Sequence, residues 1–359
     1  MSHRKRNYAD GLRGLAKLAV DATKGVTNVV QTMHGNIGGA PARLFSWPVY
    51  ASIRGITTLV GGALDVGLAR LAQALGESET VAQRELLIAA LNGVLGDYLA
   101  ETNNPLAIEM RLHRLDELPA KPKILVLVHG SSMNHAAWRA ARDLGYTPLH
   151  LDYNSGLHIS TNARTFASML EEKIDTWPVP VDEIAIVAHS MGGLVARGAC
   201  HYAEEGKLGW REKLRAAVFV ATPHHGAPLE RAGNWLETLL GVTSYSAPLA
   251  GLARIRSAGV TDLRFGYVVD EHWQGRDRFE IGIDARTPIR LPEGVACYAI
   301  AAEKDALVPR ASAMGDHPDP DLALRIPSEH RWVAPGAGHV DLLERADVWD
   351  KIEDFLRAR

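Results

Sequence analysis

Apolar residues recur at two different periods, and the period changes once along the chain. In roughly the first hundred residues the interval is three or four, which indicates amphipathic helices. The apolar positions of three expected helices are Leu12, Leu15, Ala19, Ala22, Val26, Val29 and Met33; Ile53, Ile56, Val60, Leu64, Leu71 and Leu75; and Leu87, Leu91, Val94 and Tyr98. Thr80 and Gln83 form a capping box before the third helix. Residues 1–104 are therefore predicted to be a helical extension.

After residues 103–105 (Asn-Asn-Pro) the pattern changes to strands that alternate with helices. Residues 124–128 (Ile-Leu-Val-Leu-Val) are a continuous apolar run, typical of a strand buried on both faces of a parallel sheet. Further strands are expected at 108–112, 147–153, 183–188, 216–221 and 295–301, and helices at 161–177 and 191–205. The alternation of strands and helices predicts an α/β fold with a mostly parallel central sheet.

The segment 224–293 is too long for a simple connection between strands and contains a helical pattern of its own at 234–240. We expect it to be an inserted cap or lid. Its apolar side chains, Trp235 and Leu239 among them, could line an acyl pocket or form a small satellite core. The expected organisation is a helical extension (1–104), the first part of the core (105–223), the cap (224–293) and the second part of the core (294–359).

Charge and cysteine content exclude several classes of protein. Lys and Arg number 39 against 42 Asp and Glu, so no overall basic field attracts nucleic acid. Cys200 and Cys297 lie far apart without a C-x-x-C pair, which favours reduced core thiols over a disulfide framework or a zinc site. No apolar stretch near the start reaches the ~18 residues of a membrane span, so a cytoplasmic protein is expected.

The first 24 residues carry six basic side chains against two acidic ones, a local net charge of +4. Such a basic amphipathic stretch could make peripheral contact with anionic lipid, or could simply be a solvated helix face. Both interpretations remain open.

The strongest chemical signal is the run Ala188-His189-Ser190-Met191-Gly192-Gly193, between an apolar strand and a helix. This is the pattern of a nucleophile elbow, with Ala188 in place of the first glycine. The turn is so sharp that residues two before and two after the serine must be small. The helix that begins at Met191 directs its N-terminal amides toward the site where the serine would react.

A serine hydroxyl is a weak nucleophile until a base takes its proton. His339, on the loop after residues 335–338, fits the chain order nucleophile, acid, base. His189 is a poorer candidate because neighbouring side chains in a tight turn diverge. The acid that orients the imidazole is expected to be Asp305, past the end of a strand, with Glu303 as the alternative.

An oxyanion hole needs two amide donors. One is the N–H of Met191, and the second is expected from the loop His129-Gly130-Ser131-Ser132, which follows the 124–128 strand. Gly130 allows close approach of the backbone, and Ser131 would supply the N–H. The side chain of His129 is expected to be structural.

No metal or cofactor is expected. The chain contains no G-x-x-x-x-G-K-[ST], G-x-G-x-x-G or H-E-x-x-H motif. Asp316, His317, Asp319 and Asp321 cluster, but prolines interrupt them, which favours a solvated loop over a calcium site.

Taken together, these motifs resemble the α/β-hydrolase superfamily, and within it the bacterial lipases and esterases related to GPI inositol-deacylase-like lipases. The resemblance covers about residues 107–359 and rests on Val128-His129-Gly130, Ala188-His189-Ser190-Met191-Gly192-Gly193, Ala221-Thr222-Pro223-His224-His225-Gly226, Asp305-Ala306-Leu307-Val308-Pro309 and Gly338-His339. It implies an α/β-hydrolase fold with a catalytic triad of Ser190, Asp305 and His339, and an oxyanion hole from Ser131 and Met191. His224 and His225 would be structural and lead into the lid.

The expected activity is hydrolysis of an ester or acyl-lipid through an acyl-enzyme on Ser190. A thioesterase or an acyltransferase would use the same three groups, because the fold hosts many chemistries. A catalytically silent binding module is the alternative from another class, and a complete triad argues against it.

Overall fold

The computed structural model describes residues 14, 80–227, 256–276, 284 and 286–358. Its centre is a seven-stranded sheet with the strand order β1-β3-β2-β4-β5-β6-β7. The strands are β1 (Arg111–His113), β2 (Lys123–Val128), β3 (Thr147–Asp152), β4 (Glu183–His189), β5 (Leu214–Val220), β6 (Ala296–Ala302) and β7 (Arg331–Ala334). Every neighbouring pair is parallel apart from β1 and β3, so the expected α/β fold with a mostly parallel sheet is confirmed.

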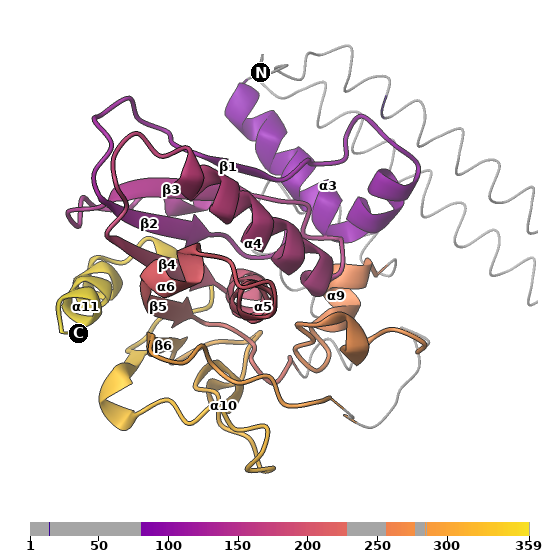
Figure 1. The fold of residues 1–359 in the computed structure, drawn as a ribbon. Helices are drawn as coiled ribbons and strands as arrows, with labels where there is room; N and C mark the ends of the chain where they lie inside the picture. Colours follow the sequence, from indigo (N-terminus) through magenta and orange to yellow (C-terminus); the bar gives the residue numbers. More distant parts are fainter. Residues whose placement is uncertain (1–13, 15–79, 228–255, 277–283, 285, 359) are drawn as a thin grey trace, which may run out of the picture.

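Helices cover the two faces of the sheet unequally. The α-helices are α3 (Val81–Glu101), α4 (Ile159–Asp175), α5 (Met191–Glu205), α6 (Trp210–Lys213), α9 (Ala258–Asp262), α10 (Arg310–Ala313) and α11 (Ala346–Arg357). Short 3₁₀ helices are η1 (His135–Trp138), η3 (Asp270–His272), η4 (Ser328–His330) and η5 (Asp341–Leu343). In Figure 1, α4 runs obliquely across the view, α5 is seen nearly end-on below it, and α11 lies at the C-terminus.

The five apolar residues 124–128 of strand β2 are explained by burial on both faces of the sheet. Ile124, Val126 and Val128 pack in the same buried cluster as residues of α3, α4 and α5. Leu125 and Leu127 point to the opposite face and join the cluster that contains residues of α11. Because successive side chains of a strand alternate between faces, a strand covered on both sides has no position for a polar residue.

The edge strand β1 is shorter than predicted. The alternation suggested a strand over 108–112, whereas the structure pairs only Arg111–His113 with β3. The N–H of Ile108 instead donates to Oδ1 of Asn92 on α3 at 2.9 Å. The backbone before β1 is therefore bound to a helix and is not available to the sheet.

Of the three N-terminal helices expected, the third is described as α3. Its capping box is confirmed, because the N–H of Gln83 donates to Oγ1 of Thr80 and the N–H of Thr80 donates to Oε1 of Gln83, both at 3.2 Å. Apart from residue 14, the first two helices lie outside the described residues, as does the helix at 234–240. None of the described helices has the length and apolarity needed to cross a bilayer.

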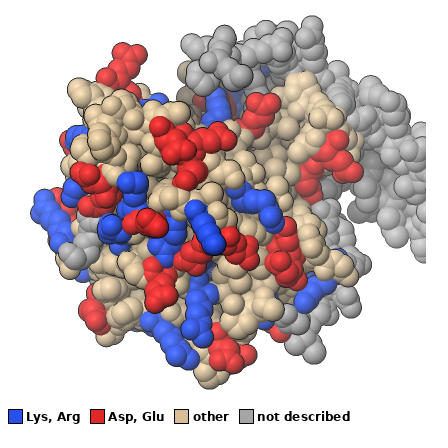
Figure 2. Space-filling model, in the orientation of Figure 1, with Lys and Arg blue, Asp and Glu red and all other residues tan. Residues whose placement is uncertain are grey.

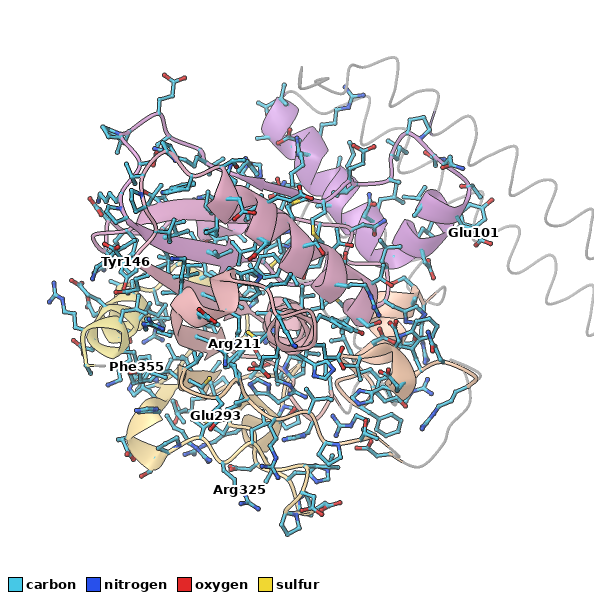
Figure 3. All side chains as sticks on the ribbon, viewed as in Figure 1. Glu101, Tyr146, Arg211, Glu293, Arg325 and Phe355 are labelled. Atoms are coloured by element: carbon cyan, nitrogen blue, oxygen red, sulfur yellow. The ribbon has the colours of Figure 1, made fainter. Side chains whose placement is uncertain are left out.

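Two further observations agree with the composition. Cys200 and Cys297 are buried and unbonded, and burial raises the pKa of the Cys200 thiol to about 12. Positive and negative side chains are interspersed over the face shown in Figure 2. Arg211 of α6 donates to the carbonyl oxygen of Glu293 at 2.5 Å, which connects α6 to the segment that enters β6; both residues are labelled in Figure 3.

Candidate active site

Ser190 lies in a strained turn between β4 and α5. Its backbone has φ 53° and ψ −127°, a combination that non-glycine residues rarely adopt. The N–H of Ser190 donates to the carbonyl oxygen of Val220 at 2.8 Å, which holds the turn against β5. A Cβ on Gly192 would lie 2.4 Å from the carbonyl oxygen of His129, and one on Gly193 would lie 1.9 Å from Oγ1 of Thr222. The small residues of the motif are therefore required by close packing.

The structure brings Ser190, His339 and Asp305 together in one hydrogen-bonded chain. Nε2 of His339 is 3.0 Å from Oγ of Ser190, and Nδ1 is 2.8 Å from Oδ2 of Asp305. A carboxylate can only accept, so Nδ1 carries the proton and Nε2 is left to accept from the serine hydroxyl. The side chains of His339 and Asp305 are almost fully buried. This is the order of groups that activates a serine.

Asp305 is held as a carboxylate. Burial alone would raise its pKa, whereas the hydrogen bond and charge of His339 lower it. The N–H groups of Leu307 and Val308 also donate to Oδ1 of Asp305, at 2.8 and 2.9 Å. The net result is a pKa below the ordinary value for aspartate.

The alternative acid, Glu303, is engaged elsewhere. Its Oε2 accepts from the N–H of Gly336 at 2.6 Å, and its own N–H donates to the carbonyl oxygen of Ala334. Glu303 thus stabilises the loop that precedes His339, while Asp305 contacts the imidazole itself.

His189, the neighbour of the serine, does not reach its hydroxyl. Its Nε2 donates to the carbonyl oxygen of His339 at 3.1 Å. Burial lowers the pKa of His189 to about 3, so the ring is neutral and positions the backbone of His339.

The loop after β2 passes beside the elbow. A Cβ on Gly130 would lie 3.1 Å from Cβ of Ser190, so the backbone of this loop approaches the serine closely. Ser131 is buried, and Met191 begins α5, where an N–H has no acceptor within the helix. Both predicted amide donors therefore belong to segments that flank Ser190, and their action on an oxyanion remains a prediction.

Two anchors of this loop were not found from the sequence. The hydroxyl of Tyr153 donates to the carbonyl oxygen of His129 at 2.8 Å, and Oγ of Ser155 accepts from the N–H of Ser132 at 2.9 Å. Ser132 has a positive φ of 61°, so the loop needs these contacts to keep its shape. The sequence does not mark Tyr153 or Ser155 as anchors, because they follow β3 whereas the loop that they bind follows β2.

The segment after β5 is buried and bonded to its surroundings. Nδ1 of His224 is 3.2 Å from Nη1 of Arg197 on α5, and the N–H of His225 donates to Oγ of Ser312 at 3.0 Å. These contacts agree with a structural role for both histidines. Arg197 was missed by the sequence analysis, although a charged residue on the buried face of an apolar helix was a signal. Trp235 and Leu239 lie outside the described residues.

Two groupings bear on metal binding. The 316–321 loop is internally bonded, with the N–H of Asp319 donating to Nδ1 of His317 at 3.0 Å. Within the described ranges, the group with metal-ligand spacing is His113, His135 and Asp152, which shares no residue with the Ser190 chain.

Comparison with known proteins identifies a family to which this chain is similar. The alpha/beta hydrolase family matches residues 125–351, a range that contains Ser190, Asp305 and His339. No curated protein matches the chain. The solved lipase BlEst2 of Bacillus licheniformis, in mature form, is similar at 16% identity over 69% of this chain and 97% of its own, with a TM-score of 0.42. The esterase Pf2001 of Pyrococcus furiosus is similar at 15% identity over 66% of this chain and 83% of its own, with a TM-score of 0.41. YbtT, the type II thioesterase of the yersiniabactin biosynthetic pathway, is similar at 15% identity over 70% of this chain and 97% of its own, with a TM-score of 0.44. Because the matched segment is more than half of the sequence, the chain belongs to the alpha/beta hydrolase family.

Proposed function

We propose that the protein is a serine hydrolase that cleaves carboxylic esters through an acyl-enzyme on Ser190. The observation that supports this most is the hydrogen-bonded order Ser190–His339–Asp305, at 3.0 and 2.8 Å. We place it with the lipases and esterases related to GPI inositol-deacylase-like lipases, with an ester or acyl-lipid substrate. That finer assignment rests on the sequence motifs.

The first half-reaction forms the acyl-enzyme. Nε2 of His339 takes the proton of the Ser190 hydroxyl as Oγ attacks the acyl carbon. The carboxylate of Asp305 stabilises the imidazolium that results. The N–H groups of Ser131 and Met191 would bind the oxyanion of the tetrahedral intermediate. Collapse of that intermediate breaks the bond to the alkoxide, which leaves with the proton from His339.

The second half-reaction releases the acid. A water molecule gives its proton to Nε2 of His339 and attacks the acyl carbon, and the Ser190 oxygen leaves with that proton. The same steps would serve a thioester, and another hydroxyl or amine in place of water would make the protein an acyltransferase.

A silent binding module is disfavoured by the burial of the three polar groups. Ordering a serine, a histidine and a carboxylate in the core is costly unless their hydrogen bonds are used. A module that only binds a ligand has no need of a base placed 3.0 Å from a strained serine.

The experiment that tests the proposal combines labelling with substrate profiling. A fluorophosphonate should label the wild-type protein and fail to label Ser190→Ala, while Ser328→Ala, an exposed serine on η4, should label normally. Hydrolysis of p-nitrophenyl esters of graded chain length, beside acyl-CoA, would separate an esterase from a thioesterase. Labelling that persists in Ser190→Ala would refute the assignment.

The acyl pocket is proposed to include Trp235 and Leu239 of the 224–293 segment. If these side chains line the pocket, alanine at either position should change the preferred acyl chain length, since each buried methylene is worth ~0.8 kcal/mol. An unchanged ratio of kcat/KM between butyrate and octanoate esters, with a lowered Tm, would assign them to a satellite core.

A further inference from the structure

Asp152, at the end of β3, is surrounded by histidines that the proposed mechanism does not use. Nε2 of His113 on β1 and Nδ1 of His135 on η1 both lie against its Oδ2, at 3.0 and 2.9 Å. The two ring nitrogens and a carboxylate oxygen all lie within 4.8 Å of one another. The ring of His150 lies nearby, with its centroid 6.4 Å from that of His113 and 6.5 Å from that of His135.

Two imidazole nitrogens and one carboxylate oxygen are a ligand set that zinc and similar divalent ions accept. With Zn–N distances of ~2.0–2.1 Å, the ligand atoms of a tetrahedral site lie ~3.3 Å apart. The His–Asp spacings of 2.9 and 3.0 Å are those of hydrogen bonds, so the ligand atoms must separate by a few tenths of an ångström. The histidine side chains are partly exposed and can make that adjustment.

The carboxylate is already oriented for such an ion. Its other oxygen, Oδ1, accepts the backbone N–H of His135 at 2.8 Å, which directs Oδ2 toward the two rings. The Arg111 guanidinium lies 3.5 Å from Oδ2, and its side chain is 54% exposed. A metal ion would displace this guanidinium into solvent, which a half-exposed side chain allows.

A second observation comes from His129, whose side chain is fully buried. Its Nδ1 lies 2.7 Å from the carbonyl oxygen of Gly130 and must donate to it. In the neutral tautomer that this hydrogen bond selects, Nε2 carries a lone pair. That lone pair has no hydrogen-bond partner among the described residues and lies 4.0 Å from Oδ1 of Asp152.

An unprotonated nitrogen and a carboxylate oxygen facing each other at this distance repel unless a cation or a hydrogen-bond donor lies near them. A metal ion on Oδ2 with a bound water supplies both. The cluster thus contains a ligand set and a buried acceptor whose partner is missing.

We propose that His113, His135 and Asp152 bind a divalent transition-metal ion of the Zn²⁺ class, with water completing its coordination and His129 accepting from that water. The ion joins β1, η1 and β3 at the edge of the sheet. Through its bound water it also stabilises the loop of His129 and Gly130. Its role is structural.

The test uses the full-length protein without an oligohistidine tag, stripped with a chelator and dialysed. Titration with Zn²⁺ should show one tight equivalent in the wild type that is lost in the double variant His113→Gln/His135→Gln. Zn²⁺ should raise the Tm of the wild type by several degrees and leave that of the double variant unchanged. Substitution with Co²⁺ should give the intense visible bands of a four-coordinate site in the wild type alone.

The matched control is His201→Gln. The side chain of His201 is 26% exposed, against 27% for His113, and its Nε2 lies 3.3 Å from Oε1 of Glu205. This variant should keep the tight equivalent, the rise in Tm and the Co²⁺ bands. His113→Gln alone, a milder change at a partly exposed position, should weaken binding at least tenfold.

Equal Zn²⁺ stoichiometry and affinity in the wild type and the double variant would overturn the proposal. So would a wild-type Tm that does not respond to Zn²⁺, or a Co²⁺ spectrum without four-coordinate bands. Those results would assign the cluster to ion pairs and a buried water. None of these measurements depends on hydrolysis, so the outcome is independent of the proposed activity.

Discussion

Asp152 and Asp305 are both buried and both contact histidines, and the two surroundings differ in which further groups they contain. Asp305 contacts one imidazole, and the far nitrogen of that ring meets the hydroxyl of Ser190. Asp152 contacts two imidazoles on the same oxygen, and a third ring faces it with a lone pair. In the first arrangement the hydrogen bonds run in a line from carboxylate to imidazole to hydroxyl, whereas in the second several rings surround one carboxylate.

The electrostatics of the two carboxylates are alike. Burial would raise the pKa of each, but the hydrogen bonds and charges of the histidines, joined at Asp305 by two backbone N–H groups, together outweigh it, so both pKa values lie below the ordinary range. The difference lies in the partners. Asp305 also accepts two backbone N–H groups, which fix one oxygen and leave the other for His339. A hydrogen-bonded His–Asp pair therefore does not define a function by itself. The group that the pair contacts next, a hydroxyl in one case and further ring nitrogens in the other, determines what the pair can do.

The largest effect should come from removing the Ser190 hydroxyl, the last group of the hydrogen-bonded chain Asp305–His339–Ser190. Ser190→Ala should lower kcat by about 10⁴-fold or more, because the covalent route disappears. His339→Ala should match it, and the double variant should be no worse than either, since the two groups act as a unit. Steady-state kinetics on a p-nitrophenyl ester measure this, with circular dichroism as the check on folding. Additive losses in the double variant would contradict the arrangement.

The next effect separates the two acids near His339. Asp305→Asn should cut kcat by orders of magnitude, because the amide cannot stabilise the imidazolium or hold its tautomer. Glu303→Gln should change kcat only a few-fold, since its carboxylate contacts the N–H of Gly336. The reverse ranking of the two variants would move the acid to Glu303.

These two predictions concern groups that the sequence was sufficient to locate. The elbow could be predicted because strand, sharp turn and helix are local, and each leaves its own pattern of small and apolar residues. Asp305 and His339 followed from the order of loops at the carboxyl ends of parallel strands, where ligands bind in such sheets. Parallel topology alone brings those ends together.

The cluster around Asp152 was not predictable in the same way. Its members come from β1, from the segments after β2 and from β3, and no two of them form a motif. Antiparallel pairing places His113 opposite His150 and Arg111 opposite Asp152. A shift of that register by one residue would turn these side chains to the other face of the sheet. The expected strand at 108–112 did not fix the register, because the true pairing covers only three residues.

A smaller effect on catalysis is expected from the cluster itself. His113→Gln should lower kcat/KM by less than about tenfold, because His113 reaches Ser190 indirectly, through Asp152, His129 and Gly130. The measurement is ester hydrolysis by the stripped protein, with and without Zn²⁺, beside the His201→Gln control. A loss as large as that of Asp305→Asn would show that the two clusters act as one unit. It would contradict the separate roles given to Asp152 and Asp305.

The smallest effect is the pH dependence of stability in the absence of metal. The hydrogen bond to Asp152 raises the pKa of His135 above its ordinary value of 6.5. A group whose pKa is higher in the folded state stabilises fully below its unfolded pKa, and this contribution is lost as the pH rises through the folded pKa. The stability difference between the wild type and His135→Gln should therefore shrink as the pH rises above the ordinary histidine value of about 6.5. Urea unfolding in the presence of chelator measures it, and His129 and His150 are common to both proteins, so their own titrations cancel to first order.

Added Zn²⁺ should reverse this pH trend in the stability difference, because metal ions compete with protons for the same nitrogens and bind more tightly as the pH rises. A difference that grows with pH in chelator, or that ignores Zn²⁺ at the higher pH, would show that His135 does not act on Asp152 as the geometry requires.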